Sequence, residues 1–275
     1  MDLSIVTKYF GFSEYPFMVT ADPKFLFFSA QVKEALAKCE FMARSRLGPL
    51  YMYGPRGSGK TTLVKLLQKK LSSEPPYHVQ LYVAANIKTS NAFLRDILEI
   101  FGVKTERSYS ASLRNFEHFL LEQAKAGKIP VLLVDEAQNL TKDMLKLIHY
   151  LLNYETDKVK LLQVVLVGQE ELGTKIIQFR ELASRMFPIA MNTMILDDMR
   201  EMIAFRLNVA GYTAPIIEAS QAEEAYQTLY AYTKGLPRDT VRVCSLLLIT
   251  LAIQRLKQAT VEMIVQAAKD SNLFI

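Results

Sequence analysis

The chain has 275 residues, of which 50% are hydrophobic and 22% are charged, and its formal net charge is +5. These values are typical of a globular protein with one or two domains, and they exclude a disordered or collagen-like chain. The N-terminus has no signal-peptide pattern, and the longest apolar run, Val243 to Ile253, is too short to span a bilayer. Cys39 and Cys244 lie in apolar helical patterns and are interpreted as buried thiols of a cytoplasmic protein.

The first 47 residues are expected to form an aromatic segment followed by one helix. Residues 1–29 are too rich in Phe, Tyr and Pro for a disordered tail, so we expect them to pack on another part of the chain. Ser29 is placed to cap a helix that runs to about Arg46 with one apolar stripe. We assign residues 1–47 to this segment and expect it to pack on the domain that follows.

A glycine-rich loop follows a short apolar strand predicted at residues 48–53. The loop fits the phosphate-binding pattern G-x-x-x-x-G-K-[ST], and residues 62–71 after it have helical periodicity. Glycines let backbone N–H groups turn toward phosphate oxygens, and the helix N-terminus adds its positive end. We expect Lys60 to reach the β- and γ-phosphates of ATP and the Thr61 hydroxyl to bind Mg²⁺. The alternative is a turn that only packs. The nucleotide-binding residues are predicted to be Gly54, Pro55, Arg56, Gly57, Ser58, Gly59, Lys60, Thr61 and Thr62.

Strands and helices alternate in the middle of the chain. Further strands are expected at 78–84, 129–134 and 162–168 and within 187–196, and helices at 91–101, 112–126 and 142–153. Because the strands are uniformly apolar, we predict an α/β domain at 48–196 with a five-stranded parallel sheet covered by helices on both faces. From Asp197 no strand pattern remains. An all-helical subdomain is therefore predicted at 197–275, with helices at 197–210, 218–234, 237–257 and 260–271.

Polar residues follow two of the predicted strands. Asp135 and Glu136 come directly after the strand at 129–134, and a carboxylate at that end of a parallel strand points into the ligand crevice. Asp135 is expected to hold the Mg²⁺ shell, and Glu136 to orient and polarise the water that attacks ATP. The alternative is a pair of solvated acids. Gln169 ends the strand at 162–168 and is a candidate contact to the γ-phosphate or the water.

Two arginines are candidates for the remaining catalytic roles. Arg185 precedes the fifth strand, where an arginine finger can reach the ATP of a neighbouring subunit, and Arg180 is a competing candidate. Arg238 lies at the start of the longest helix of the second subdomain, from where it can approach the phosphates. An exposed arginine with no such role is the alternative for each.

The order of these features resembles that of AAA+ ATPases, which implies a P-loop AAA+ fold with a small all-helical lid, ATP and Mg²⁺ as cofactors, and ATP hydrolysis. More closely, the chain resembles the ExeA/GspA family, in which the aromatic N-terminal segment lies near the nucleotide base. The motifs that carry this resemblance are Phe10–Phe12, Pro16-Phe17, Asp22-Pro23, Phe28-Ser29, Val134–Leu140, Leu151–Asn153, Glu155-Thr156, Lys160–Gln163, Val167–Gln169, Glu171-Leu172, Arg206-Leu207 and Ala210-Gly211.

The sequence departs from that family in two respects. It has Gln169-Glu170-Glu171 where the family usually has Gln-Pro-Glu, and it ends at Ile275, where secretion members continue through a membrane span into a peptidoglycan-binding part. A stand-alone ATPase of this length resembles the TnsC, TniB and IstB kind, encoded in mobile elements. That resemblance implies a DNA-binding, ATP-dependent oligomer that recruits or activates a transposase.

The main hypothesis is therefore an AAA+ ATP hydrolase that regulates DNA transposition without a membrane partner. We expect a homo-oligomer, either a ring or a filament, that holds double-stranded DNA by sequence-independent backbone contacts. Its partners would be a transposase and a target-selection protein. The modest basic excess permits DNA binding without demanding it. Candidate DNA contacts, which are otherwise solvated loop residues, are Lys88, Thr89, Ser90, Lys104 and Arg107.

The alternative hypothesis is an ExeA/GspA-like assembly ATPase of a secretion or envelope machine that acts with a separate membrane partner. The family resemblance favours this alternative, and the lack of a tethering segment in the sequence counts against it. A replication or clamp-loading ATPase is a weaker hypothesis, because no helix-turn-helix module follows the predicted lid. A nucleotide-binding scaffold without hydrolysis is disfavoured by Glu136.

Overall fold

The computed structural model describes residues 3–85, 89–157 and 159–274. Its chain divides into two compact units. The unit that we call the α/β unit comprises residues 31–56 and 60–191. The other, which we call the helical unit, comprises the described residues of 1–30, 57–59 and 192–275. Each unit has its own hydrophobic core.

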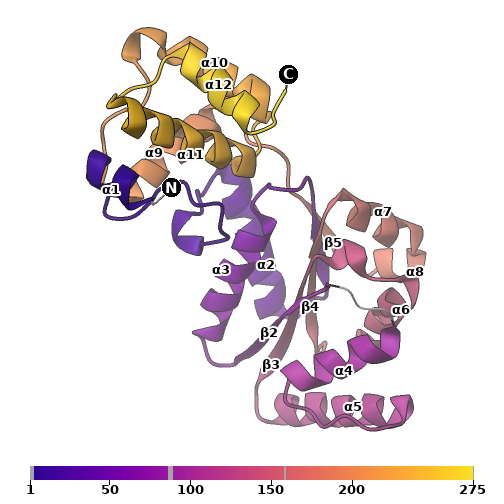
Figure 1. Ribbon diagram of the computed structural model, residues 1–275. Coiled ribbons are helices and arrows are strands. Elements are labelled where there is room, and N and C mark those ends of the chain that lie inside the picture. The colour runs from indigo at the N-terminus through magenta and orange to yellow at the C-terminus, as the bar shows by residue number, and fades with distance from the viewer. Residues whose placement is uncertain (1–2, 86–88, 158, 275) are drawn as a thin grey trace. The chain divides into compact units, whose positions relative to one another are not determined.

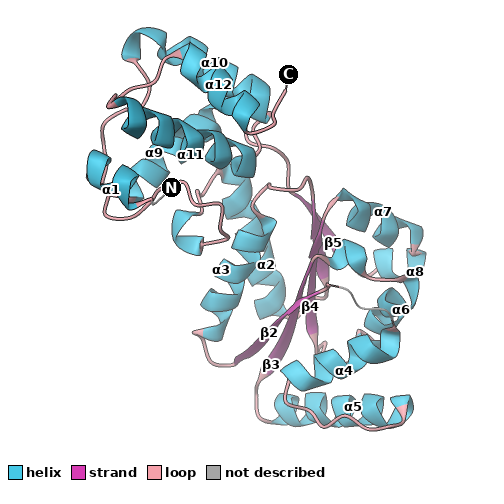
Figure 2. Cartoon of the chain, in the orientation of Figure 1, coloured by secondary structure: helices cyan, strands magenta, loops and turns pink. Residues whose placement is uncertain are grey.

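The α/β unit is built on one parallel sheet of five strands, in the order β2-β3-β4-β1-β5. Figure 2 shows the strands of this sheet in magenta. All four strand pairs are parallel, with registers such as Leu50↔Val165 and Val134↔Leu166. This confirms the predicted α/β class and the predicted sheet. The strands are β1 (Leu50–Tyr53), β2 (Tyr77–Val83), β3 (Ile129–Asp135), β4 (Gln163–Gly168) and β5 (Phe187–Ala190).

Helices cover both faces of this sheet, as uniformly apolar strands require. On one side lie α2 (Ala30–Ser45) and α3 (Lys60–Ser72), and α4 to α8 lie on the other (Figure 1). Every residue of β3 is buried, and so are Leu63 and Leu67 of α3 and Phe93 of α4. The helices of the second side are α4 (Ser90–Ile100), α5 (Tyr109–Lys125), α6 (Lys142–Leu151), α7 (Glu170–Gln178) and α8 (Arg180–Ala183).

Four helices at the predicted places form the helical unit, together with α1 near the N-terminus. No helix of the described residues is long and apolar enough to cross a membrane. Cys39 and Cys244 are free and buried, as predicted, and burial raises the pKa of each thiol to about 12. The helices are α1 (Ser4–Phe10), α9 (Leu196–Val209), α10 (Ala222–Thr233), α11 (Pro237–Gln254) and α12 (Val261–Asp270).

The aromatic N-terminal segment packs inside the helical unit. Phe10 and Phe12 stack on each other at a centroid distance of 5.1 Å, and both meet Tyr212 edge-on. They share one buried cluster with side chains of α9, α11 and α12. The division into two units groups the aromatic segment with the helices of this unit, and α2 with the sheet. Packing of residues 1–47 on the α/β domain stays a prediction.

A buried arginine fixes this segment to α9. The Arg206 guanidinium donates to the carbonyl oxygens of Pro16 at 2.8 Å, Phe25 at 3.2 Å and Met18 at 3.2 Å. It also lies 4.9 Å from the ring centroid of Phe25. The irregular segment would otherwise bury carbonyl groups without donors, so the guanidinium satisfies backbone that forms no sheet or helix. Burial lowers the pKa of Arg206 to about 10.

Candidate nucleotide-binding site

The glycine-rich loop connects β1 to α3, as the motif predicts. Gly54, Gly57 and Gly59 have φ angles of 155°, 91° and 94°, which side-chain-bearing residues rarely adopt. A Cβ on Gly54 would lie 1.9 Å from the carbonyl oxygen of Met191, so only glycine fits there. Helix α3 begins at Lys60, directly after the loop. The backbone N–H groups at its start lie at the positive end of the helix dipole, which suits phosphate oxygens.

Lys60 lies buried against its own loop. Its Nζ is 2.8 Å from the carbonyl oxygen of Gly54 and 2.8 Å from that of Pro55. The side chain is only 8% exposed, so the ammonium is held within the loop rather than in bulk solvent. A cation at this position complements the negative charge of a polyphosphate bound by the loop.

Asp135 and Thr61 meet where β3 ends and α3 begins. Asp135 is 5% exposed, and its carboxylate accepts hydrogen bonds from the Thr61 hydroxyl and, at 2.9 Å, from the Glu136 backbone N–H. Burial raises the pKa of Asp135, and these two hydrogen bonds partly offset the effect. A hydroxyl beside a carboxylate provides the oxygen ligands that Mg²⁺ prefers. The described residues contain no group of three or more His, Cys, Asp or Glu placed to hold a metal.

Glu136 follows Asp135 in a left-handed backbone conformation, with φ 55°. One oxygen of its carboxylate, Oε2, accepts a hydrogen bond of 2.5 Å from the Gln138 side chain. Gln138 also accepts a 3.0 Å hydrogen bond from the Gln169 backbone N–H, at the end of β4. Gln138 lies within the motif Val134–Leu140, but the sequence alone predicted no role for it. Its position two residues after Glu136 is the sequence feature that could have indicated a role in the site.

Gln169 lies at the predicted edge of the sheet. It follows β4, which pairs with β3, and it is the residue before α7. Its backbone is tied to Gln138, and its side chain is half-buried. The structure thus brings Lys60, Thr61, Asp135 and Gln169 to the carboxyl edge of one sheet. A direct role for the Gln169 side chain at phosphate or water remains a prediction.

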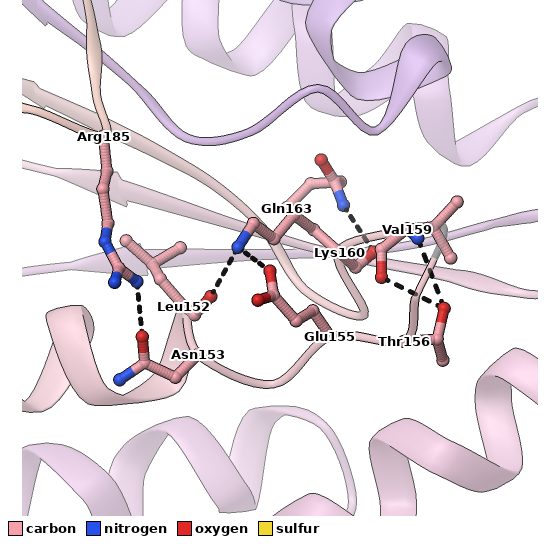
Figure 3. Close-up of polar contacts among 8 residues, drawn as sticks. All are labelled: Leu152, Asn153, Glu155, Thr156, Val159, Lys160, Gln163 and Arg185. Carbon is pink, nitrogen blue, oxygen red and sulfur yellow. Dashed lines mark hydrogen bonds and ion pairs between the residues drawn. The ribbon is translucent and has the colours of Figure 1, made fainter.

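Arg185 lies at the opposite edge of the same sheet. It precedes β5, whose first residue pairs with Leu50 at the start of β1. The guanidinium is exposed and donates to the side-chain carbonyl of Asn153 (Figure 3). Beside it, Lys160 forms an ion pair with Glu155 (Figure 3). The four-residue length of β5 separates the two edges by about 13 Å, so Arg185 does not reach the phosphate loop of its own chain.

Arg238 belongs to the helical unit, as do residues 57–59 of the loop. It is the second residue of α11, and its backbone N–H donates to the carbonyl oxygen of Gly57 at 3.2 Å. A Cβ on Gly57 would lie 2.9 Å from the Cβ of Arg238, so the contact depends on glycine. A role for the Arg238 side chain at the phosphates remains a prediction.

The predicted DNA contacts do not form one cluster. The Thr89 hydroxyl caps α4 by accepting from the Ala92 backbone N–H, and Ser90 is the first residue of that helix. Lys104, which is paired with Glu106 at 3.0 Å, and the exposed Arg107 follow the other end of α4. The 11-residue helix separates the two groups by about 16 Å. Lys88 lies outside the described residues. DNA contact by these residues remains a prediction.

The comparisons with known proteins agree with this geometry. Residues 43–176 match the family model described as AAA domain. Among solved structures, the chain is similar to the Aeropyrum pernix ORC2 protein in its ADPNP–ADP complexes, with a TM-score of 0.64, 12% identity, and coverage of 87% of this chain and 66% of that one. It is also similar to the Aeropyrum pernix ORC1 protein in complex with DNA, with a TM-score of 0.65, 15% identity, and coverage of 90% and 66%. The fold is therefore that of the P-loop AAA+ ATPases.

One curated relative gives a more particular likeness. The chain is 34% identical over 253 residues to general secretion pathway protein A of Aeromonas hydrophila. The match covers 88% of this chain and 44% of the relative, so the chain spans less than half of that protein. This similarity agrees with the ExeA/GspA resemblance and favours the secretion hypothesis over transposition. The TnsC, TniB and IstB resemblance stays a prediction.

Proposed function

We propose that this protein hydrolyses ATP and uses the cycle to assemble or remodel a secretion or envelope machine, together with a membrane partner. The observation that carries the hydrolysis proposal is the junction of Thr61, Asp135 and Glu136 beside a phosphate-binding loop. The similarity to general secretion pathway protein A supports the cellular context. We therefore prefer the secretion hypothesis, which was the alternative on sequence alone, to the transposition hypothesis.

Each residue of the carboxyl edge has a distinct part in this reaction. Backbone N–H groups of the loop and of the start of α3 bind the phosphates, and Lys60 neutralises their charge. Thr61 and Asp135 would hold Mg²⁺, which neutralises charge on the phosphate oxygens when bound. Glu136 accepts a proton from the attacking water, which makes that water a better nucleophile.

Two positive groups outside this edge complete the proposal. Arg185 would stabilise the charge that develops on the transferred phosphoryl group in a neighbouring subunit, because it lies at the far edge of its own sheet. Arg238 would approach the phosphates from α11. An interface that joins one edge of a subunit to the opposite edge of the next is heterologous, and it generates a ring or a filament.

A second candidate function is ATP-dependent binding of double-stranded DNA, as in the transposition hypothesis. The net charge of +5 permits it, and the similar ORC1 structure is a complex with DNA. Phosphate contacts make such binding weaken steeply with salt.

Turnover by a Glu136→Gln variant tests hydrolysis. We expect kcat to fall by about 10²–10⁴-fold while nucleotide affinity is kept, because the amide binds no proton but has the same shape. Glu99→Gln, at an exposed position of α4, is the matched control and should be unchanged. Equal turnover by Glu136→Gln and wild type would remove the proposed general base.

Two binding measurements then separate the two cellular roles. Sedimentation of the Glu136→Gln protein with membranes of its source cells, with and without ATP, tests the secretion role. Anisotropy of a labelled DNA duplex with a slowly hydrolysed ATP analogue, over a salt series, tests the DNA role. ATP-dependent membrane association without DNA binding supports secretion. Salt-sensitive DNA binding without membrane association contradicts it.

A further inference from the structure

The turn after β3 holds Glu136 in a strained conformation. A residue other than glycine at φ 55° lies in the left-handed region, and neighbouring contacts must stabilise it. The Glu136 N–H donates to the Asp135 carboxylate at 2.9 Å, and its carbonyl accepts from the Asn139 N–H at 3.0 Å. Both backbone groups of Glu136 are therefore engaged, and the turn sets the direction of its Cα–Cβ bond.

Gln138 fixes the side chain that the turn leaves free to rotate. Its Oε1 accepts from the Gln169 N–H at 3.0 Å, and its Nε2 donates to Glu136 Oε2 at 2.5 Å. The orientation of this amide is determined by its partners, because a backbone N–H must face the oxygen and a carboxylate must face the nitrogen. One side chain thus connects Glu136 to the junction of β4 and α7.

The surroundings of Gln138 are shaped to receive this amide. A Cβ on Gly168 would lie 2.7 Å from Gln138 Oε1 and 2.9 Å from its backbone nitrogen, so a side chain at position 168 would displace the amide. Lys175 of α7 donates to the carbonyl oxygen of Gln138 and, at 3.1 Å, to that of Leu140. The turn is therefore attached to α7 through both main chain and side chain.

We propose that Gln138 is a positioning residue for ATP hydrolysis. It fixes the plane of the Glu136 carboxylate by engaging Oε2, which leaves Oε1 to accept the proton of the attacking water. This inference rests on the proposed function, because it takes Glu136 as the general base. A displacement of a reacting group by about 1 Å can lower a rate by about 10²-fold. Loss of the amide should therefore affect the chemical step rather than nucleotide binding.

Gln138→Leu removes both hydrogen bonds and keeps similar volume. Gly168→Ala keeps the amide but would displace it together with the backbone nitrogen of Gln138. For both variants we expect kcat to fall by about 10–100-fold, with the Kd for a fluorescent ATP analogue within about twofold of wild type. Asn139→Ala is the matched control on the same turn. Its side chain donates to the Ala84 carbonyl at 2.8 Å and does not contact Glu136, so kcat should be nearly unchanged.

A double-mutant cycle separates positioning from structural support. In a Glu136→Gln background, Gln138→Leu should change the single-turnover rate by less than about twofold, because the group that it positions is gone. A wild-type kcat in Gln138→Leu, or an equal loss in Asn139→Ala, would overturn the role of Gln138 alone. If Glu136→Gln retained wild-type turnover, the proposed function would fail first and this inference with it.

Discussion

The two edges of the parallel sheet hold their polar side chains in opposite ways. At the carboxyl edge, Lys60 and Asp135 are less than a tenth exposed, and each is hydrogen-bonded within the chain. At the opposite, amino edge, where the strands begin, Arg185 is exposed. Its partner is a neighbouring side chain, Asn153. The proposed function assigns the first edge to a nucleotide bound by the same subunit. The second presents an exposed cation, as the proposed action of Arg185 on another subunit requires.

This contrast predicts the largest effect for a residue that is far from its own phosphate loop. Arg185→Ala should lower kcat by about 10³-fold, because it removes positive charge from the transition state in the neighbouring site. Arg180→Ala, at an exposed position five residues earlier, is the control and should retain turnover. If Arg180→Ala lost turnover and Arg185→Ala retained it, the arginine finger would be Arg180 and not Arg185.

At the carboxyl edge, Asp135 should lower the stability of the folded protein at neutral pH. Burial raises the pKa of Asp135 in the folded protein above its ordinary value of 3.8, so its favourable contribution to folding is present below that pH and is lost as the pH rises through the folded pKa. Asp135→Asn keeps the shape and removes the charge. We therefore expect the variant to be more stable than wild type at pH 7, and the difference to disappear as the pH approaches 3.8.

Urea unfolding of both proteins at several pH values measures this difference. A wild type that is more stable than Asp135→Asn at neutral pH would mean that the hydrogen bonds to this carboxylate outweigh its burial. The buried carboxylate of the carboxyl edge would then stabilise the folded protein, contrary to this expectation.

The smallest effect is expected from the partner of Arg185. Asn153→Ala should change kcat by less than about fivefold, because an exposed hydrogen bond contributes only about 0.5–1.5 kcal/mol. Steady-state turnover, measured beside Arg185→Ala, gives the comparison. A loss as large as that of Arg185→Ala would show that the arginine acts through Asn153 within its own subunit.

Much of the α/β unit was predictable from the sequence, because buried parallel strands are uniformly apolar and the phosphate loop has fixed glycines. The strand predicted at 78–84 is Tyr77–Val83, and the end of β3 places Asp135 as expected. Helices α7 and α8 were not predicted, although they connect β4 to Arg185. They are short, and the long helical patterns of the last 80 residues are easier to recognise than theirs.

The features that were missed depend on contacts between distant segments. The role of Gln138 requires Gly168, 30 positions later, to lack a side chain, and it requires Glu136 to adopt a left-handed backbone. Arg206 satisfies three carbonyl groups about 180 to 190 residues away in the chain. No local pattern contains such information. Local sequence patterns therefore predicted the charged residues of the candidate site, whereas the contacts around them come from the structure.

In the proposed assembly, one active site combines the carboxyl edge of one subunit with the amino edge of the next. The most direct test mixes two inactive proteins, Lys60→Ala and Arg185→Ala, under conditions in which they assemble together. An intact carboxyl edge on the Arg185→Ala subunit would receive Arg185 from its Lys60→Ala neighbour, so turnover should reappear in the mixture. Turnover that stays at the level of the separate variants, in a co-assembled mixture, would contradict a shared site.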